Sequence, residues 1–440
     1  MDWNKLISDK RLGLEQYHDP QLHTRSDFQR DYDRLIFSSP FRRLQNKTQV
    51  FPLPGSIFVH NRLTHSLEVS SVGRSMANEV TNILIDKHGF NIDTAKLRDM
   101  GDIVATACLA HDLGNPPFGH NGEKTISSFF TEGAGLALKP LLTDHQWSDF
   151  AHFEGNANSF RLLTHQFEGR RKGGYAMTYS ALASVVKYPF ASTQAGEKGK
   201  FGYFETEEDI YLQVAEELGI PETEHGKHAR HPFVFLMEAA DDICYQIMDI
   251  EDAHKLKILS TSEVKDLLLN FFGEKEQLHM IDSMRRLDDP NEQVGYMRSK
   301  VIGALVGGCS KEFTDHETEI LAGDYHGSLT ANIPGRLSEA YAVCSETAWN
   351  KIYNAPQVID IELAGNRIIT YLMENLVGAV VAPEKAYSRL LLEKVPHQYN
   401  VRSDNLNTRL QGVVDHVSAM TDVYALDLFR TLNGHTLPAV

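Results

Sequence analysis

The sequence predicts an all-α fold: a helical core, additional helices toward the C-terminus and short β-hairpin insertions. Apolar residues recur three and four positions apart in most long segments, which is the period of an amphipathic helix. Strand signals are few, and Gly-rich or charged stretches separate the helical segments. An apolar content of 42% over 440 residues is enough for a large core.

Three long helices are expected in the N-terminal half of the chain. The first covers residues 62–85, with an apolar stripe made of Leu63, Leu67, Val72, Met76 and Val80. The second covers residues 97–113 and is stopped by Gly114 and the prolines after it. The third covers residues 231–256 and has a proline near its first turn.

Shorter elements complete the expected fold. Helices are expected at residues 262–272, 366–381 and 421–432. One hairpin is expected at residues 48–60, around Pro54-Gly55, and a second at residues 198–206.

Composition limits the function. A formal charge of −16 argues against broad affinity for nucleic acid or an anionic membrane, but it allows a local basic pocket. No apolar run is long enough to span a membrane, and the first twenty residues lack the apolar centre of a signal peptide. The four cysteines are scattered without a CxxC pair, so a cytoplasmic location is expected.

Four side chains suggest a metal site. His65, the adjacent pair His111-Asp112, and Asp241 each lie within or at the end of an apolar helix. Taken singly, such a His is usually a hydrogen-bonded core residue and such an Asp a helix cap. Together, two imidazoles and two carboxylates suit magnesium, manganese or another divalent transition metal, with positions left for water and a substrate oxygen.

These residues also carry a family resemblance. Their order, H…HD…D, resembles the signature of the HD-domain metal phosphohydrolases, which are all-helical. More closely, the chain resembles the deoxynucleoside triphosphate triphosphohydrolases, the dGTPase-like branch. The matching segments, from about residue 25 to the C-terminus, are RSDFQRDYDRLIFSSPFRRLQNKTQVFPL, HNRLTHSLEV, HDLGNPPFGHNGE, HFEGNANSFRLL, KYPF with KGKFGYF, MEAADDICYQIMDIEDA and SAMTDVYALDLFRTLNG.

The resemblance implies an organisation, a reaction and partners. Residues 1–255 would hold an N-terminal segment and the HD core, and residues 256–440 a helical region packed on that core. The reaction would be metal-dependent hydrolysis of dGTP or several dNTPs to deoxynucleoside and inorganic tripolyphosphate. By resemblance the protein would be a homo-oligomer, a hexamer, and an allosteric dNTP or single-stranded DNA would be a further partner.

The resemblance also assigns roles to individual residues. His65, His111, Asp112 and Asp241 would bind the metal, and His120 with Glu123 would form the catalytic pair. The expected substrate contacts are Arg62, Lys187, Tyr188 and Lys200 at the phosphates, Gln49 near the sugar and base, Tyr245 and Asp249 around the deoxyribose, and Asn156, which a helix start explains equally well.

Asp241, Tyr245 and Asp249 are spaced four apart, which places them on one helical face.

For the basic run Arg42, Arg43 and Lys47, solvation and phosphate binding remain equal alternatives. GHNGEKT and GEKGKF fail as phosphate loops because the first lacks the glycine spacing and the second lacks the Ser or Thr.

Other interpretations stay open. The three histidines at 225, 228 and 231 have ligand-like spacing but are interpreted as a solvated loop. The alternative functions are another HD-type phosphohydrolase, acting as a nucleotidase or on a cyclic nucleotide or alarmone, and a nucleotide-sensing or nucleic-acid-binding protein with little turnover.

Overall fold

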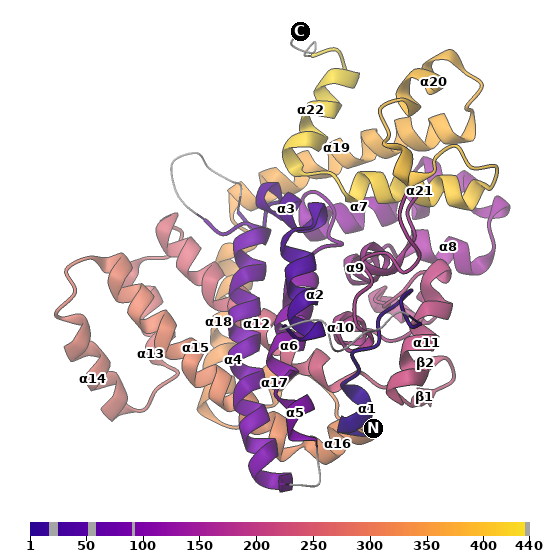
Figure 1. Ribbon diagram of the computed structural model, residues 1–440. Coiled ribbons are helices and arrows are strands. Elements are labelled where there is room, and N and C mark those ends of the chain that lie inside the picture. The colour runs from indigo at the N-terminus through magenta and orange to yellow at the C-terminus, as the bar shows by residue number, and fades with distance from the viewer. Residues whose placement is uncertain (17–24, 52–58, 90–92, 436–440) are drawn as a thin grey trace.

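The structure is a computed structural model that describes residues 1–16, 25–51, 59–89 and 93–435 (Figure 1). The α-helices are α1 (Trp3–Leu6), α2 (Asp27–Ile36), α3 (Ser39–Arg43), α4 (Arg62–His88), α5 (Thr94–Leu97), α6 (Met100–Ala110), α7 (Gly119–Thr131), α8 (Asp144–Ala151), α9 (Gly155–Thr164), α10 (Tyr179–Val185), α11 (Glu208–Leu218), α12 (Pro232–Lys255), α13 (Thr261–Leu269), α14 (Glu274–Met284), α15 (Pro290–Asp315), α16 (Glu317–Ala322), α17 (Leu329–Asn332), α18 (Arg336–Thr347), α19 (Pro356–Val381), α20 (Ala386–Leu392), α21 (Leu406–Ser418) and α22 (Asp422–Leu432).

The remaining elements are short. They are the 3₁₀ turns η1 (Leu44–Asn46), η3 (Ala134–Leu141), η4 (Ser192–Gln194), η5 (Gly196–Lys198), η6 (Glu205–Glu207) and η8 (His397–Tyr399), the π-helical turn η7 (Ala348–Ile352), and the strands β1 (Glu222–Glu224) and β2 (Lys227–His228). Within the described ranges, β1 and β2 form the one sheet, an antiparallel pair. The all-α prediction is confirmed.

α4, α6 and α12 form the centre of the molecule, and α15 packs against α4 and α12 (Figure 1). α4 begins at a capping box, in which the side chains of Asn61 and Thr64 each accept from the other's backbone N–H. All residues of α6 except Asp102 are buried, as expected for a helix that is apolar on every side. α12 begins with Pro232 in its first turn, as the sequence predicts.

The predicted apolar stripe of α4 is wrong in part. Leu67 is 40% exposed, whereas Met76 and Val80 are fully buried. The five residues from Leu67 to Val72 advance the helix so far that the two side chains face about 140° apart. The buried face instead runs through His65 and continues along residues 69, 73, 76, 80 and 84, because α6, α12 and α15 all pack against that side.

The predicted hairpin at residues 198–206 is wrong. The segment runs from the end of η5 into η6, and its only strand-like contact is a single bridge between Ala191 and Tyr203. Phe201, Tyr203 and Phe204 are all buried, so the segment has no solvent-facing side of the kind that a hairpin presents. For the hairpin at residues 48–60, Thr48 and Asn61 form one bridge, and residues 52–58 lie outside the described ranges.

The solvated-loop interpretation of the three histidines is wrong for His231. His225 is exposed, but His231 is buried and caps α12 by accepting from the backbone N–H of Phe233. Its other ring nitrogen donates to the carbonyl oxygen of Leu6. Burial lowers the pKa of His231 to about 4, so the ring is neutral in the folded protein at neutral pH.

Buried polar contacts join the C-terminal helices to the N-terminal half. The guanidinium of Arg161 in α9 donates to both carboxylate oxygens of Asp415 in α21, each over 2.8 Å. The carboxylate of Asp422 accepts from the backbone N–H groups of Thr48 and Phe118. Figure 1 shows α19–α22 together at one end of the molecule, beside α7.

The division into residues 1–255 and 256–440 stays a prediction. Buried contacts such as the Arg161–Asp415 pair join residues on the two sides of the proposed boundary. Such contacts are expected if the C-terminal region depends on the core for its stability. Among the helices that the structure describes, none is both long enough and apolar enough to cross a membrane.

We expect Asp415→Asn to lower the free energy of unfolding by about 3 kcal/mol, because it leaves the buried Arg161 charge with Glu207 as the one carboxylate partner in the described ranges. The matched control is Asp427→Asn, whose exposed pair with Arg430 spans 3.9 Å and should change stability by less than about 0.5 kcal/mol. Urea unfolding followed by circular dichroism measures both. Equal midpoints for the two variants would contradict the proposed role of the buried pair.

Candidate active site

Three ligand-type side chains meet where α4, α6 and α12 converge. His65 lies in the first turns of α4, His111 follows the last residue of α6, and Asp241 lies in α12. Oδ1 of Asp241 is 3.1 Å from Nε2 of His65 and 3.4 Å from Nε2 of His111. Across the described ranges, this is the one group of three or more His, Cys, Asp or Glu residues whose ligand atoms gather, all within 4.8 Å of one another.

The chemistry of the three donors fits a divalent cation. Nδ1 of His111 donates to the carbonyl oxygen of Cys108 over 2.6 Å, so Nε2 is the ring nitrogen that can bind either a proton or a metal. That Nε2 is buried and makes no hydrogen bond in the described part of the chain, although Asp241 lies nearby. Burial opposes protonation of His111, but Asp112 and Asp241 outweigh it and raise its pKa to about 9. The site therefore attracts positive charge.

Asp112, the fourth predicted ligand, lies beside this group. Its Oδ1 is 3.7 Å from Nε2 of His111. Arg62 donates to Oδ2 over 2.8 Å, and the Asn115 side chain donates to Oδ1 over 2.5 Å. Burial disfavours the charged carboxylate, but Arg62 and His111 outweigh that effect and keep the pKa of Asp112 low. Its role as a ligand stays a prediction.

The bend between α6 and α7 turns the chain back toward the three donors. Phe118 adopts a left-handed conformation with φ 62°, which is rare for a bulky residue. Its N–H donates to Asp422, which holds the bend from the C-terminal side. Gly119 also has a positive φ, and a Cβ there would lie 2.4 Å from Nη2 of Arg62. Only glycine fits this close approach.

α7 then presents the predicted catalytic pair. Nδ1 of His120 lies 2.9 Å from Oε2 of Glu123. The other oxygen of Glu123 accepts from the backbone N–H of Gly155 over 2.8 Å. The hydrogen bond from His120 to Glu123, together with the carboxylate charge, raises the pKa of His120 above its ordinary value. Glu123 is buried while His120 is open to the cavity, so the carboxylate orients the ring.

A cavity of about 300 Å³ is lined by His111, Asp112, Asp241 and His120. It is lined by seven of the eight predicted substrate-binding residues: Gln49, Arg62, Asn156, Lys187, Tyr188, Lys200 and Tyr245. The eighth, Asp249, lies one helical turn beyond Tyr245 and accepts from the hydroxyl of Tyr353 over 2.9 Å. Burial raises the pKa of Asp249 to about 8. Oε1 of Gln49 is buried without a hydrogen-bond partner in the described ranges, which leaves it available to a ligand.

The cations of the cavity are held by acidic neighbours. Lys200 contacts Glu154 over 2.6 Å, and Lys187 contacts Glu238 over 3.1 Å. For Lys187, burial opposes the charged form, but Glu238 outweighs it and holds the pKa above its ordinary value. These lysines are therefore charged and already positioned before any anion binds.

Sequence reasoning missed several residues at this site. Asp242 lines the cavity beside Asp241, and burial and that neighbour raise its pKa to about 7. The adjacent Asp-Asp pair in α12 was the available signal. Lys47 is buried rather than solvated, and it donates to the carbonyl oxygens of Asn115 and Ser418. No local pattern indicates a lysine that bonds two distant carbonyl groups.

We expect the apparent affinity of the protein for Mn²⁺ to rise with pH up to about 9, because a proton and the metal compete for Nε2 of His111. One proton released corresponds to a change of about tenfold per pH unit below that value. Titrations with a competing chelator measure the slope, and the exposed His326→Ala variant should keep it. A flat profile would contradict the assignment of His111.

The family comparisons agree with this geometry. The model of the HD domain matches residues 62–187, and the model of the phosphohydrolase-associated domain matches residues 331–431. The chain is 36% identical to a deoxyguanosinetriphosphate triphosphohydrolase-like protein of Pseudomonas aeruginosa, with both chains covered completely. It is 36% identical to one of Synechocystis over 99% of this chain and 100% of that protein.

A deoxyguanosinetriphosphate triphosphohydrolase of Yersinia enterocolitica is 28% identical, over 98% of this chain and 99% of that protein. The HD model covers the stretch that contributes His65, His111 and the pair His120–Glu123, and the relatives match the chain from end to end. The chain therefore belongs to the deoxyguanosinetriphosphate triphosphohydrolase-like family of HD-domain enzymes.

Proposed function

We propose that this phosphohydrolase cleaves deoxynucleoside triphosphates to deoxynucleoside and inorganic tripolyphosphate. His65, His111 and Asp241 would hold a divalent metal, with Asp112 as the fourth ligand. The observation that supports the proposal most is that one cavity rich in cations is lined by two of the three donors, His111 and Asp241, and by His120 of the His120–Glu123 pair. The metal, when bound, would supply Lewis-acid polarisation of a phosphate oxygen.

The basic side chains of the cavity suit a triphosphate. The ligand carries about four negative charges, and an acidic protein must concentrate cations to bind it. Arg62, Lys187 and Lys200 come from three different segments and are each held by a carboxylate. A phosphate oxygen can replace or join these carboxylates without a large movement of the side chains, so little entropy is lost on binding.

His120 is suited to moving a proton at its Nε2 atom. Because Glu123 accepts from Nδ1–H, Nε2 is the nitrogen left to face the cavity. The raised pKa of His120 strengthens it as a base and keeps a proton available near neutral pH. Whether that proton comes from water or goes to the leaving 5′ oxygen, the same hydrogen bond to Glu123 orients the ring.

The α12 face beyond the donors suits a deoxyribose. Tyr245 stacks on Tyr353 with ring centroids 5.8 Å apart, and Tyr353 in turn donates to Asp249. This packing fixes the Tyr245 ring against the cavity, where it would leave no room for a 2′ hydroxyl. Asp249 would accept from the 3′ hydroxyl, in exchange for its present bond to Tyr353.

The proposal includes the cellular location, the oligomeric state and further ligands of the protein. All four cysteines are free and buried, which suits the cytoplasmic location we expect. We also propose a homo-oligomer, a hexamer in the first instance, with an allosteric dNTP or single-stranded DNA as additional ligands. Sedimentation with and without each ligand tests these three points separately from the reaction.

The reaction is tested by incubating the metal-loaded protein with each dNTP in turn and following the phosphorus NMR spectrum. The proposal requires that the phosphorus signals formed are those of tripolyphosphate and that the other product is free deoxynucleoside. Release of pyrophosphate or orthophosphate instead would favour another HD-type phosphohydrolase. Binding without any turnover would favour a nucleotide sensor.

We expect His120→Ala to lower kcat by about 10²- to 10⁴-fold while the protein retains its metal, because His120 is not among the donors.

Glu123→Gln removes the group that raises the pKa of His120, so the limb of the pH–rate profile that reports His120 should move to lower pH. The exposed His279→Ala variant is the control. An unshifted limb in Glu123→Gln would show that Glu123 does not act through His120.

We expect Tyr245→Ala to raise kcat/KM for GTP relative to dGTP by about tenfold or more, since it removes the ring that excludes a 2′ hydroxyl. Parallel assays of the two nucleotides measure the ratio, and the largely exposed Tyr387→Ala should leave it unchanged. A ratio unchanged in Tyr245→Ala would place sugar discrimination elsewhere.

A further inference from the structure

A second cavity lies beside the first. It has a volume of about 530 Å³ and shares His120 and Lys200 with the cavity at the metal donors. Tyr245, Gln49, His111 and Asp241 line the first cavity and not the second, so the shared residues mark the end remote from the proposed nucleoside position. His120 and Lys200 therefore form the boundary between the two cavities.

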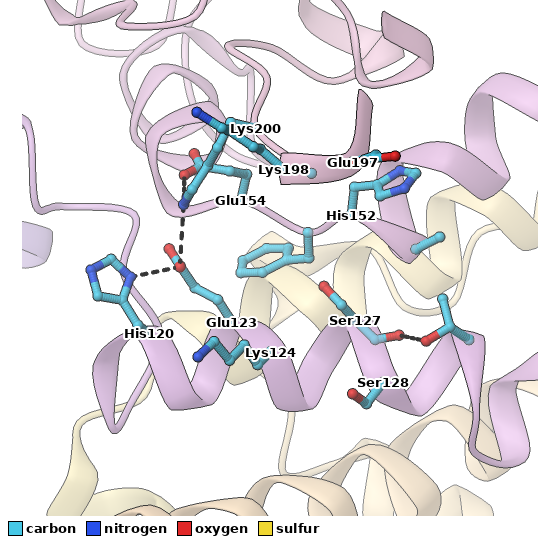
Figure 2. A pocket seen from close by; sticks show the side chains of 14 residues that line it. His120, Glu123, Lys124, Ser127, Ser128, His152, Glu154, Glu197, Lys198 and Lys200 are labelled. Atoms are coloured by element: carbon cyan, nitrogen blue, oxygen red, sulfur yellow. Dashed lines mark hydrogen bonds and ion pairs between the residues drawn. The ribbon is translucent and has the colours of Figure 1, made fainter. Parts of the chain in front are cut away.

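One wall of this cavity is a polar stripe on α7. Residues 120, 123, 124, 127, 128 and 131 all line the cavity, and their spacing of three and four places them on one helical face. Figure 2 shows His120, Glu123, Lys124 and Ser127 along this face, with Glu154 and Lys200 on the opposite side. The stripe supplies an ammonium group and hydroxyl groups, which are donors for phosphate oxygens.

The opposite wall carries the segment GEKGK that fails as a nucleotide phosphate loop. Lys198 and Lys200 line the cavity from this segment, beside His152. Gly196 and Gly199 both have positive φ, so the chain turns sharply on each side of Lys198. The segment thus faces the helix stripe across the cavity, as Figure 2 shows for Lys198, Lys200 and Glu154.

The charges of the lining residues leave cations available. Glu123 is engaged by His120, and Glu154 by Lys200. Lys124 and Lys198 form no ion pair with any residue that the structure describes. Glu197 is the remaining lining carboxylate, and it offsets one of these two charges. Among the lining carboxylates, those of Glu123 and Glu154 are therefore neutralised, while the ammonium groups of Lys124 and Lys198 stay available.

We propose that the second cavity binds inorganic tripolyphosphate after cleavage and is the path by which this product leaves. The inference rests on the proposed function, since it takes the product of that reaction as its ligand. A linear polyphosphate carries several negative charges along a narrow chain and needs cations and hydroxyl donors at intervals. Lys200, which lines both cavities, supplies such groups together with Lys124, Lys198, Ser127 and Ser128.

Single-stranded nucleic acid fits the cavity less well. Such ligands need aromatic faces on which bases stack. Among the lining residues that the structure describes, Phe153 is the one Phe, Tyr or Trp, and it is buried. The lining instead carries ammonium, imidazole and hydroxyl groups, which donate to phosphate oxygens, together with the carboxylates of Glu123, Glu154 and Glu197.

The test is the double variant Lys124→Ala/Lys198→Ala, with the exposed and unpaired Lys275→Ala as the control. Inorganic tripolyphosphate is titrated into each protein by calorimetry at low ionic strength, with divalent metal in excess because the ligand chelates it. We expect its Kd, and its constant as a product inhibitor, to rise about five- to tenfold in the double variant only. KM for the dNTP should change by less than about twofold.

An unchanged Kd for tripolyphosphate would overturn the inference, and so would a KM that rises in step with the inhibition constant. A double variant that loses affinity for a short oligodeoxynucleotide but not for tripolyphosphate would show a nucleic-acid site instead. The calorimetric result is independent of turnover. A protein that binds tripolyphosphate through Lys124 and Lys198 but leaves every dNTP intact would refute the proposed function alone.

Discussion

The approach of one carboxylate to two imidazoles in the helical core is the interaction on which the rest of the site depends. Asp241 lies within 3.4 Å of His65 and His111, at a point to which α4, α12 and the residue after α6 each contribute a side chain. Burying such groups is costly unless each has a partner. The helix packing fixes these positions, so the neighbouring bend at Phe118 and the pair His120–Glu123 have a rigid reference.

The C-terminal helices help to hold the bend between α6 and α7. Asp422 accepts from the backbone of Phe118 in the bend and from Thr48, the neighbour of Gln49 in the cavity wall. Lys47 bonds the carbonyl oxygen of Asn115 in the same bend. The bend is thereby held from α22 and from the segment before α4. This gives a physical reason for one chain to carry both the HD domain and the phosphohydrolase-associated domain.

The sequence was sufficient for features that depend on local spacing. The periodicity of α4, α6 and α12 placed His65, His111 and Asp241 on helices, and the four-residue spacing placed Tyr245 on the face of Asp241. The sequence was not sufficient where residues far apart in the chain determine whether a side chain is buried. Burial of Lys47 depends on Ser418, some 370 positions away, with which it shares a hydrogen bond. The aromatic run at 201–204 imitates a strand, but its side chains are buried on all sides.

The central claim is that the three donors hold one cation, and anomalous scattering tests it most directly. Crystals grown with Mn²⁺ and measured on both sides of the manganese absorption edge should show one strong anomalous peak between His65, His111 and Asp241. Its height should fall sharply in Asp241→Ala crystals, in which one donor is missing. Manganese bound elsewhere with no peak among these three side chains would contradict the account.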